Sequence, residues 1–536
     1  METTVTQASK AATLACLALI SAAYLSLPGC STGENALGTS TGEGEGQIQF
    51  TLGGISEGSE ENITKAGLAE QTVYVPLDSG MAIACTLAPE PASSTRTTSD
   101  MTLGNTYRLI AYDAAGDIAG YADGVAGTTA PQIALPAGTY SVAAYSFNST
   151  TLPTAGTSVS VPAGTDLLYF KTTNVVVNEG ASTAVTVTFD HKFNAVKVVA
   201  DAQALVLTAD DASINGIGKT VTAASATLGN SYPATMAVSD GTLTAGTATT
   251  TDISWASPST KNPTSNEAYI YTNSGSSLTL TFTSITFGGG SASLTSTAKS
   301  VTFTQAMATN TSYTVTTKFR KLCGAYVSTA GASGSWKEFL CWNLTGYQTV
   351  PSTVDPFTPS YLINGAYWQW GNKNYSVGPP TSAAGASASY TWSSTNYNTS
   401  STAWNSGTEA APVKNSTYDP CPTNYRVPTN TEWTGVVNNN TGASVGTWSS
   451  SSNVSNFSAA RAIGPSTTVA TLLLLGAGDR LNSTGASNGR GVFGRCWSSR
   501  IISGGSYHLR IGSGGIATDA SLDFRSYGFS VRCIAE

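Results

Sequence analysis

The chain has 536 residues, enough for about three domains, and its 40% hydrophobic content is sufficient for buried cores. Charged residues make up only 11%, while glycine numbers 54, a composition typical of short strands joined by turns. The formal net charge of -7 provides no excess of positive charge to neutralise phosphates, which argues against nucleic acid as a partner.

The N-terminus resembles a bacterial lipoprotein signal peptide. Lys10 precedes the apolar run AATLACLALISAAYLSL, which is too short for a confident membrane span and ends in LPGC. The resemblance implies that residues 1–29 are removed and that Cys30 is diacylated, which would anchor the chain in the outer membrane. The alternative is an ordinary secretory peptide cut elsewhere. Residues 30–47 are rich in Gly, Ser, Thr and Glu and predict a flexible tether.

From residue 48 to about residue 320, apolar and polar side chains alternate with a period of two. This pattern, interrupted by Gly, Pro, Asn and Asp, predicts half-buried strands of antiparallel sheets. We expect one β-sandwich over residues 48–172 and a second over residues 173–320. The side chains predicted to share buried faces include Val185, Val187, Phe189, Leu278, Leu280, Phe282, Tyr313, Val315 and Phe319.

Several segments of this region carry a family resemblance. They are Thr95-Arg96, GNTYRLIAYDAAG, LPAGTYSVAAYSFNST, DLLYF and FDHKFNAVKV, in that order. Together, over roughly residues 40–320, they resemble the fimbrillin superfamily, the lipoprotein pilins of Bacteroidia. The resemblance implies a mainly β fold with two transthyretin-like β-sandwich domains.

The same resemblance implies an assembly mechanism. In polymerising fimbrillins, a trypsin-like protease cuts after an arginine of the first domain and removes the first strand. A strand donated by another subunit fills the groove, because its backbone pairs with the exposed strand edges. Arg96 is the candidate cleavage site, and other fimbrial subunits are the implied partners. An ordinary surface arginine is the alternative.

The last two-fifths of the chain has a different composition. The two predicted sandwiches contain only Cys85, whereas five cysteines follow residue 320. In an exported protein these cysteines predict disulfides, with one thiol left over. We therefore expect a separate domain over residues 321–536, whose cysteines are Cys323, Cys341, Cys421, Cys496 and Cys533.

The segment DPCPTNYRVPTNTEW holds one of these cysteines rigidly. Pro420 and Pro422 restrict the backbone on both sides of Cys421. A bond from Cys421 to Cys533, in the final strand, would close a loop of over a hundred residues and contribute roughly 4 to 5 kcal/mol.

The same segment predicts a helix. Thr429 and Glu432 fit a capping box, so we expect the helix to begin at Thr429. Trp433 and either Val436 or Val437 would lie on its buried side.

A second resemblance covers residues 321–536. The segments SWKEFLCWNLTG, YLINGAYWQWGNK, DPCPTNYRVPTNTEW, LLLLGAGDRLNSTG, GVFGRCWSSR and YGFSVRCI are similar to the Fibrobacter major paralogous domain. This family implies an α+β fold related to C-type lectins and formylglycine-generating enzymes. The chain departs from it at Cys341 and Cys496, each followed by Trp, which suggests a Cys341–Cys496 disulfide.

The C-terminal domain lacks the motifs of a calcium-dependent lectin or of an enzyme. There is no EPN, QPD or WND triplet, and no persuasive P-loop, HExxH or G-x-S-x-G signature. We expect no catalytic residue, metal or cofactor. His191 and His508 have no partner at ligand spacing and are expected to pack or to hydrogen-bond.

Aromatic side chains are the remaining candidates for ligand contact. Tryptophans among Asn and Ser can stack on sugars and bond their hydroxyls. Trp368 and Trp370 are the weaker candidates, because a core position suits them as well. Trp392 and Trp404, in long polar loops, are the better candidates for exposure.

We therefore expect a cell-surface fimbrial subunit, a tip or accessory adhesin, that binds a glycan or host protein through its C-terminal domain. The alternative is a surface lipoprotein that does not polymerise and captures glycan or protein at the outer membrane. A weaker alternative is an enzyme on the scaffold of the formylglycine-generating enzymes.

Overall fold

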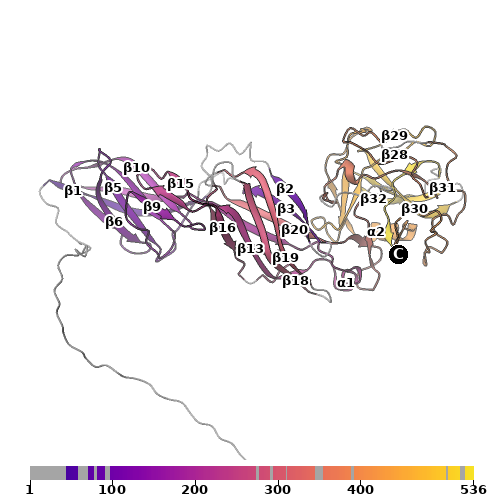
Figure 1. Ribbon diagram of the computed structural model, residues 1–536, viewed down its shortest axis with the longest axis horizontal. Helices are drawn as coiled ribbons and strands as arrows, with labels where there is room; N and C mark the ends of the chain where they lie inside the picture. The colour runs from indigo at the N-terminus through magenta and orange to yellow at the C-terminus, as the bar shows by residue number, and fades with distance from the viewer. Residues whose placement is uncertain are drawn as a thin grey trace, which may run out of the picture.

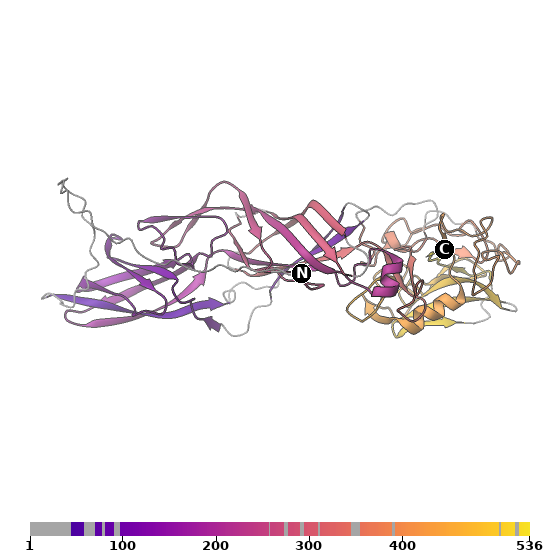
Figure 2. The same cartoon turned by 90° about the horizontal axis from the view of Figure 1, so that it is seen from below.

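The computed structural model describes residues 44–57, 70–77, 81–90, 97–256, 258–272, 277–289, 294–308, 311–344, 354–387, 392–502, 505–519 and 525–536. These residues form three bodies in a row, and two perpendicular views show the same elongated arrangement (Figures 1 and 2). Strands are the main regular elements of all three bodies, which confirms the predicted mainly β class. None of the helices described is long and apolar enough to cross a bilayer.

The first body is built on an eight-stranded sheet with the order β4-β1-β11-β10-β8-β5-β6, in which β7 also pairs with β1. Strand β1 therefore lies inside the sheet, parallel to β11 and antiparallel to β7 and β4. The strands are β1 (Glu45–Glu57), β4 (Thr97–Ser99), β5 (Thr106–Tyr112), β6 (Ile118–Val125), β7 (Gln132–Pro136), β8 (Gly138–Ser146), β10 (Leu168–Val177) and β11 (Ser182–His191).

The second body is a sandwich of two sheets, with the orders β17-β12-β20-β3-β2 and β16-β13-β18-β19. One apolar core includes buried residues of both sheets. The strands are β2 (Gln71–Pro76), β3 (Ala82–Pro89), β12 (Asn194–Asp201), β13 (Thr220–Ser231), β16 (Thr249–Ile253), β17 (Ala268–Ile270), β18 (Ser277–Gly288), β19 (Leu294–Ala306) and β20 (Tyr313–Arg320).

The predicted period of two is confirmed in both bodies. In β11, Val185, Val187 and Phe189 are buried while the threonines between them face outward or are half-buried. The other predicted core residues of β18 and β20 are all at most 4% exposed. Alternation places every second side chain on the core face, because successive residues of a strand point to opposite sides.

The chain crosses between these two bodies. After β1 in the first sheet, the β2–β3 hairpin joins the second body, where β3 pairs with β20, and β4 then returns to the first sheet. The expected boundary between residues 172 and 173 falls inside β10, and β11 also belongs to the first sheet. A small sheet of β9 (Ser158–Val161), β14 (Ala234–Ala237) and β15 (Leu243–Ala245) pairs strands from both predicted ranges.

The third body starts with β21, and its described residues form four short sheets and one α-helix. Helix α2 (Asn430–Asn439) has the predicted capping box between Thr429 and Glu432. The other elements are β21 (Cys323–Tyr326), β22 (Trp336–Phe339), η3 (Tyr361–Ile363), β23 (Trp368–Gln369), β24 (Tyr425–Arg426), β25 (Thr441–Val445), β26 (Ala460–Gly464), β27 (Leu472–Leu475), β28 (Asp479–Arg480), β29 (Ser487–Asn488), β30 (Phe493–Ile502), β31 (Gly505–Gly512), β32 (Gly515–Asp519), β33 (Gly528–Phe529) and β34 (Ile534–Ala535).

The third body is docked on the second. The Tyr326 hydroxyl donates a hydrogen bond of 3.0 Å to the Ala212 carbonyl, which belongs to helix α1 (Ala209–Asn215) of the second body. The Ser213 hydroxyl accepts the Trp336 backbone N–H at 2.9 Å. Tyr326 and Trp336 also share a buried apolar cluster with side chains around α1. This buried contact holds the third body on the second through side chains as well as through the connecting chain.

Candidate functional site

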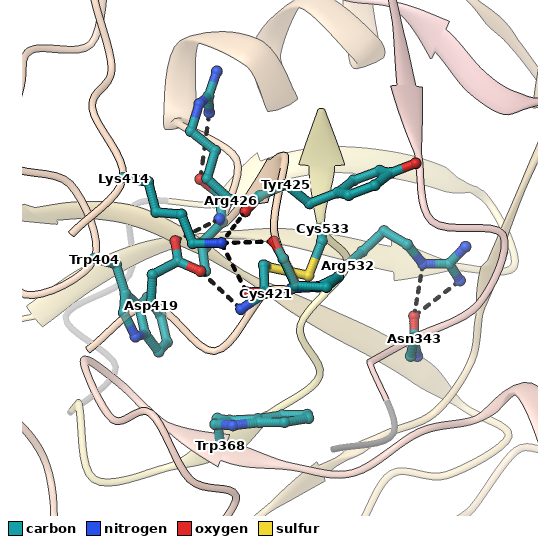
Figure 3. Close-up of a disulfide and its surroundings, with 12 residues drawn as sticks. Asn343, Trp368, Trp404, Lys414, Asp419, Cys421, Tyr425, Arg426, Arg532 and Cys533 are labelled. Atoms are coloured by element: carbon teal, nitrogen blue, oxygen red, sulfur yellow. Dashed lines mark hydrogen bonds between the residues drawn. A yellow bond between two sulfur atoms is a disulfide. The ribbon is translucent and has the colours of Figure 1, made fainter. Parts of the chain in front are cut away.

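Two disulfides brace the third body. Cys421 bonds Cys533, as expected from the sequence, and closes a sequence separation of 112 residues (Figure 3). The second disulfide joins Cys323 and Cys341, so the expected Cys341–Cys496 bond is wrong. The β21–β22 hairpin pairs Cys323 with Phe339, which brings Cys341 within 5.2 Å of Cys323, Cα to Cα.

Cys496 is instead a free thiol in the apolar core of the third body. It is 1% exposed, and this burial raises the pKa of its thiol to about 12. A cysteine nucleophile requires the thiolate form, which is scarce at neutral pH for such a thiol. This environment argues against a catalytic role for Cys496.

The loop around Cys421 is held from both sides by charged side chains. The Asp419 carboxylate accepts the backbone N–H groups of Cys421 at 2.8 Å and of Val427 at 2.9 Å. The Lys414 ammonium donates to the carbonyls of Cys421 at 2.8 Å, Pro422 at 2.6 Å and Tyr425 at 2.5 Å. Figure 3 shows Lys414 and Asp419 beside the disulfide. Side chains therefore satisfy the backbone of a loop that has little regular secondary structure.

The helix that follows is joined to this brace by an ion pair. The Arg426 guanidinium donates to both carboxylate oxygens of Glu432, at 2.8 and 2.6 Å. Glu432 also accepts the backbone N–H of Thr429, as a capping box requires. Trp433 and Val436 are fully buried on the inner side of α2, whereas Val437 is half-buried.

Arg532, next to Cys533, fixes the segment that contains Asn343. Its guanidinium donates to the Asn343 side-chain oxygen at 3.0 and 2.9 Å (Figure 3). It also donates to the Leu340 carbonyl at 3.0 Å. Burial lowers the pKa of Arg532 to about 10. The side-chain oxygen of Asn343, which follows Trp342, is therefore engaged in hydrogen bonds within the protein. No group of three or more His, Cys, Asp or Glu side chains in the described ranges could hold a metal ion.

Three of the four candidate tryptophans are core residues. Trp368, Trp370 and Trp404 are at most 1% exposed, which corrects the expectation that Trp404 is exposed. The Trp404 indole N–H donates to the Tyr418 carbonyl at 3.0 Å, and its ring centroid lies 5.2 Å from that of Trp370. Although the loop is polar, its tryptophan is buried, because a large aromatic side chain adds buried apolar surface to the core of a body whose strands are short.

Trp392 is the candidate that remains at the surface. It is half-buried, and its indole N–H donates to the Asn482 carbonyl at 2.9 Å. Further along the same polar loops, Val413 and Tyr418 are 54% and 41% exposed. We call the exposed side chains of residues 392–418 the loop surface. It presents aromatic and hydroxyl groups on a backbone braced by the Cys421–Cys533 disulfide, an arrangement suited to binding.

Sequence reasoning missed Lys414, whose ammonium organises the loop beneath this surface. A lysine in a polar stretch gives no signal of such a role, because its partners are backbone carbonyls that carry no side-chain identity. Asp419 had a clearer signal, since Asp before Pro commonly bonds a nearby backbone N–H.

Cys30 and Arg96 lie outside the described residues. The nearest described elements to Arg96 are β3, which ends at Pro89, and β4, which begins at Thr97. The two histidines are placed by the structure: His191 Nδ1 lies 2.6 Å from an oxygen of Asp166, and His508 is buried 5.0 Å from the ring of Phe529.

No protein-family model matches the chain, and no curated protein matches it. A solved structure of a "putative cell adhesion protein" from Bacteroides fragilis matches 51% of this chain and 92% of its own, with 13% identity and a TM-score of 0.33. A "putative cell adhesion protein" from Bacteroides uniformis matches 52% and 98%, with 15% identity and a TM-score of 0.27. "Putative polysaccharide binding proteins" from Bacteroides thetaiotaomicron match 35% and 71%, with 13% identity and a TM-score of 0.24.

Proposed function

We propose that the chain is a cell-surface fimbrial subunit, a tip or accessory adhesin, anchored through Cys30 until a cut after Arg96 releases it for assembly. Its third body binds a glycan or host protein through the loop surface. The observation that carries the proposal is the position of the strands before Arg96. The three strands described there, β1, β2 and β3, are structural members of the first two bodies.

Strand β1 lies between strands on both sides. It pairs with β11 from Gln47 to Ser56, and with β7 from Glu45 to Gln49. Ile48, Phe50 and Ile55 fill the first core and are at most 4% exposed. Removing β1 would leave unpaired backbone groups on β7 and β11 and three empty apolar positions. A strand from another subunit with the same alternation would satisfy both.

The β2–β3 hairpin extends the same argument to the second body. Strand β3 pairs with β20 along its full length, and Ile83, Cys85 and Leu87 are at most 1% exposed in the second core. A cut after Arg96 therefore frees strands from two bodies together. The donated segment would need to complete both, which favours a long donor with two alternating apolar runs.

The docked third body fits an adhesive role. Its buried contact with α1 would pass the load from a bound ligand to the second body. The disulfides keep the loop surface folded in the oxidising environment outside the cell.

Surface fimbriae isolated from the producing cells test the proposal. We expect the wild-type polypeptide in the fimbriae to begin at Thr97 and to have lost the alkylatable thiol of Cys85, because that residue leaves with the N-terminal segment. Arg96→Ala should remain full length and stay out of the fimbriae. Lys65→Ala, a change in the same N-terminal segment, should mature normally. Normal maturation and incorporation of Arg96→Ala would contradict the proposal.

A surface lipoprotein that does not polymerise is the second candidate. The intact chain favours it in one respect, since β1 and β3 already complete both bodies within one molecule. Full-length protein on the cell surface, absent from purified fimbriae, would support this candidate over the first.

A further inference from the structure

A cleft of about 510 Å³ lies where the first body meets the second. Its lining comes from β10, from the end of β11 and Lys192 after it, from the β14–β15 turn with the start of β15, and from Tyr271 beyond β17. Figure 1 shows β10 and β15 side by side at this junction. The volume lies within the range of about 300–1,000 Å³ that is typical of pockets for small ligands. We call it the waist cleft.

The aromatic walls of the waist cleft are fixed from behind. The Tyr169 hydroxyl donates to the Val238 carbonyl at 3.0 Å, and Tyr271 stacks on Phe193 with 5.4 Å between ring centroids. The hydrogen bond joins β10 of the first body to Val238, which follows β14. A ligand would therefore meet preformed ring surfaces, which lowers the entropy cost of binding.

The charged groups of the waist cleft have a defined arrangement. Lys171 is exposed on β10, and the Lys192 ammonium lies 5.4 Å from the centroid of the Tyr169 ring. Hydrogen bonds from Thr242 lower the pKa of the nearby Asp240, and the charges of Lys171 and Lys192 lower it further. Both lysines thus act electrostatically on the β14–β15 turn, which also lines the waist cleft.

The remaining polar groups suit hydroxyls. Asp190 and Thr242 also line the waist cleft and can bond to a hydroxylated ligand. Asp190 and the nearby Asp240 both add negative charge, so the cleft disfavours a dianionic phosphate more than a monoanionic carboxylate. A sugar that carries one carboxylate has the groups that this lining can bind. Its ring can pack on an aromatic side chain, its carboxylate can pair with the two ammonium groups, and its hydroxyls can hydrogen-bond to the polar side chains.

We propose that the waist cleft binds an acidic sugar residue, of the uronic or sialic acid class. The carboxylate pairs with Lys171 and Lys192, the ring lies against Tyr271, and hydroxyls bond to Asp190 and Thr242. The site is separate from the loop surface of the third body and would give the first two bodies a ligand-binding site of their own.

Calorimetric titration of the full exported chain with D-glucuronate and with N-acetylneuraminate tests this site. Lys171→Gln removes one charge from an exposed strand position, so the fold is retained. Lys318→Gln, an exposed lysine of β20 on the second body, is the matched control. We expect at least one of the acids to bind, Lys171→Gln to weaken that binding about tenfold, and Lys318→Gln to leave it unchanged.

D-glucose and inorganic phosphate complete the experiment. Neutral glucose should bind at least about tenfold more weakly than the acid, and raising the salt concentration should weaken acid binding. Equal binding by Lys171→Gln and wild type, phosphate binding as tight as that of the acids, or no saturation by either acid would each overturn the proposal.

Discussion

The first two bodies and the third body of this protein are stabilised in different ways. In the sandwiches, long strands such as β18 and β19 satisfy their backbones through ladders and bury alternating side chains. In the third body several strands are two residues long, and side chains such as Lys414 and Asp419 satisfy the backbone instead. Both disulfides of the described residues lie there.

This difference indicates which substitutions should destabilise each region. A ladder spreads stabilisation over many equivalent backbone hydrogen bonds, so the sandwiches should tolerate the loss of a single surface side chain. The third body concentrates stabilisation in a few named groups. Single substitutions should therefore separate the two regions, and intrinsic fluorescence can follow them, since nine of the ten tryptophans lie after residue 320.

The largest effect is expected from the Cys421–Cys533 disulfide. Replacing both cysteines by alanine should lower the free energy of unfolding of the third body by about 5 kcal/mol, because a loop of 112 residues loses its closure. Denaturant unfolding followed by tryptophan fluorescence measures the change. Removing the Cys323–Cys341 bond, with its separation of 18 residues, should cost only about 3 kcal/mol. A larger loss from the shorter loop would contradict the comparison.

Asp419 should give the third body a pH dependence that the sandwiches do not share. Burial raises the pKa of its carboxyl to about 6 from 3.8, so the folded chain holds a proton that the unfolded chain releases between these values. This proton therefore contributes up to about 3 kcal/mol to the free energy of unfolding. The contribution is fully present below about pH 4 and is lost as the pH rises through 6. Asp419→Asn should remove this part of the profile in denaturant titrations at pH 4 to 7. An unchanged difference between wild type and variant across that range would refute it.

Lys414 should have a smaller effect. Lys414→Met removes the donor to three carbonyls at the Cys421 loop and should lower the stability of the third body by about 1–3 kcal/mol. Lys373→Met is the matched control, because that exposed lysine bonds a single carbonyl, that of Ser416, and should cost less than about 1 kcal/mol. Fluorescence-detected unfolding would show equal losses for the two variants if Lys414 had no special role.

Much of the local structure was predictable because it depends on neighbours in the sequence. The alternation of Val185, Val187 and Phe189 predicts which face of β11 is buried. The capping box of α2 likewise involves residues three positions apart, Thr429 and Glu432, so it could be identified before the fold was known.

The errors concerned a disulfide partner and the burial of a loop residue. The sequence suggested that Cys341 pairs with Cys496, since each precedes a tryptophan, but strand register places Cys323 opposite Phe339 and makes the local bond. Trp404 was expected at the surface because its neighbours are polar, yet the fold turns it onto Trp370. Neither a disulfide partner nor the burial of a loop residue is a local property.

The sequence by itself determined the strand-rich class of the first two bodies and the start of α2, because the period of side-chain exposure and a helix cap are written within a few consecutive residues. Only the tertiary structure decided that β2 and β3 complete the second sandwich, and that Tyr271 and Lys171 line the same cleft. These placements depend on long-range strand pairing, in which the buried area and backbone hydrogen bonds of the whole sheet select a partner that no short segment specifies.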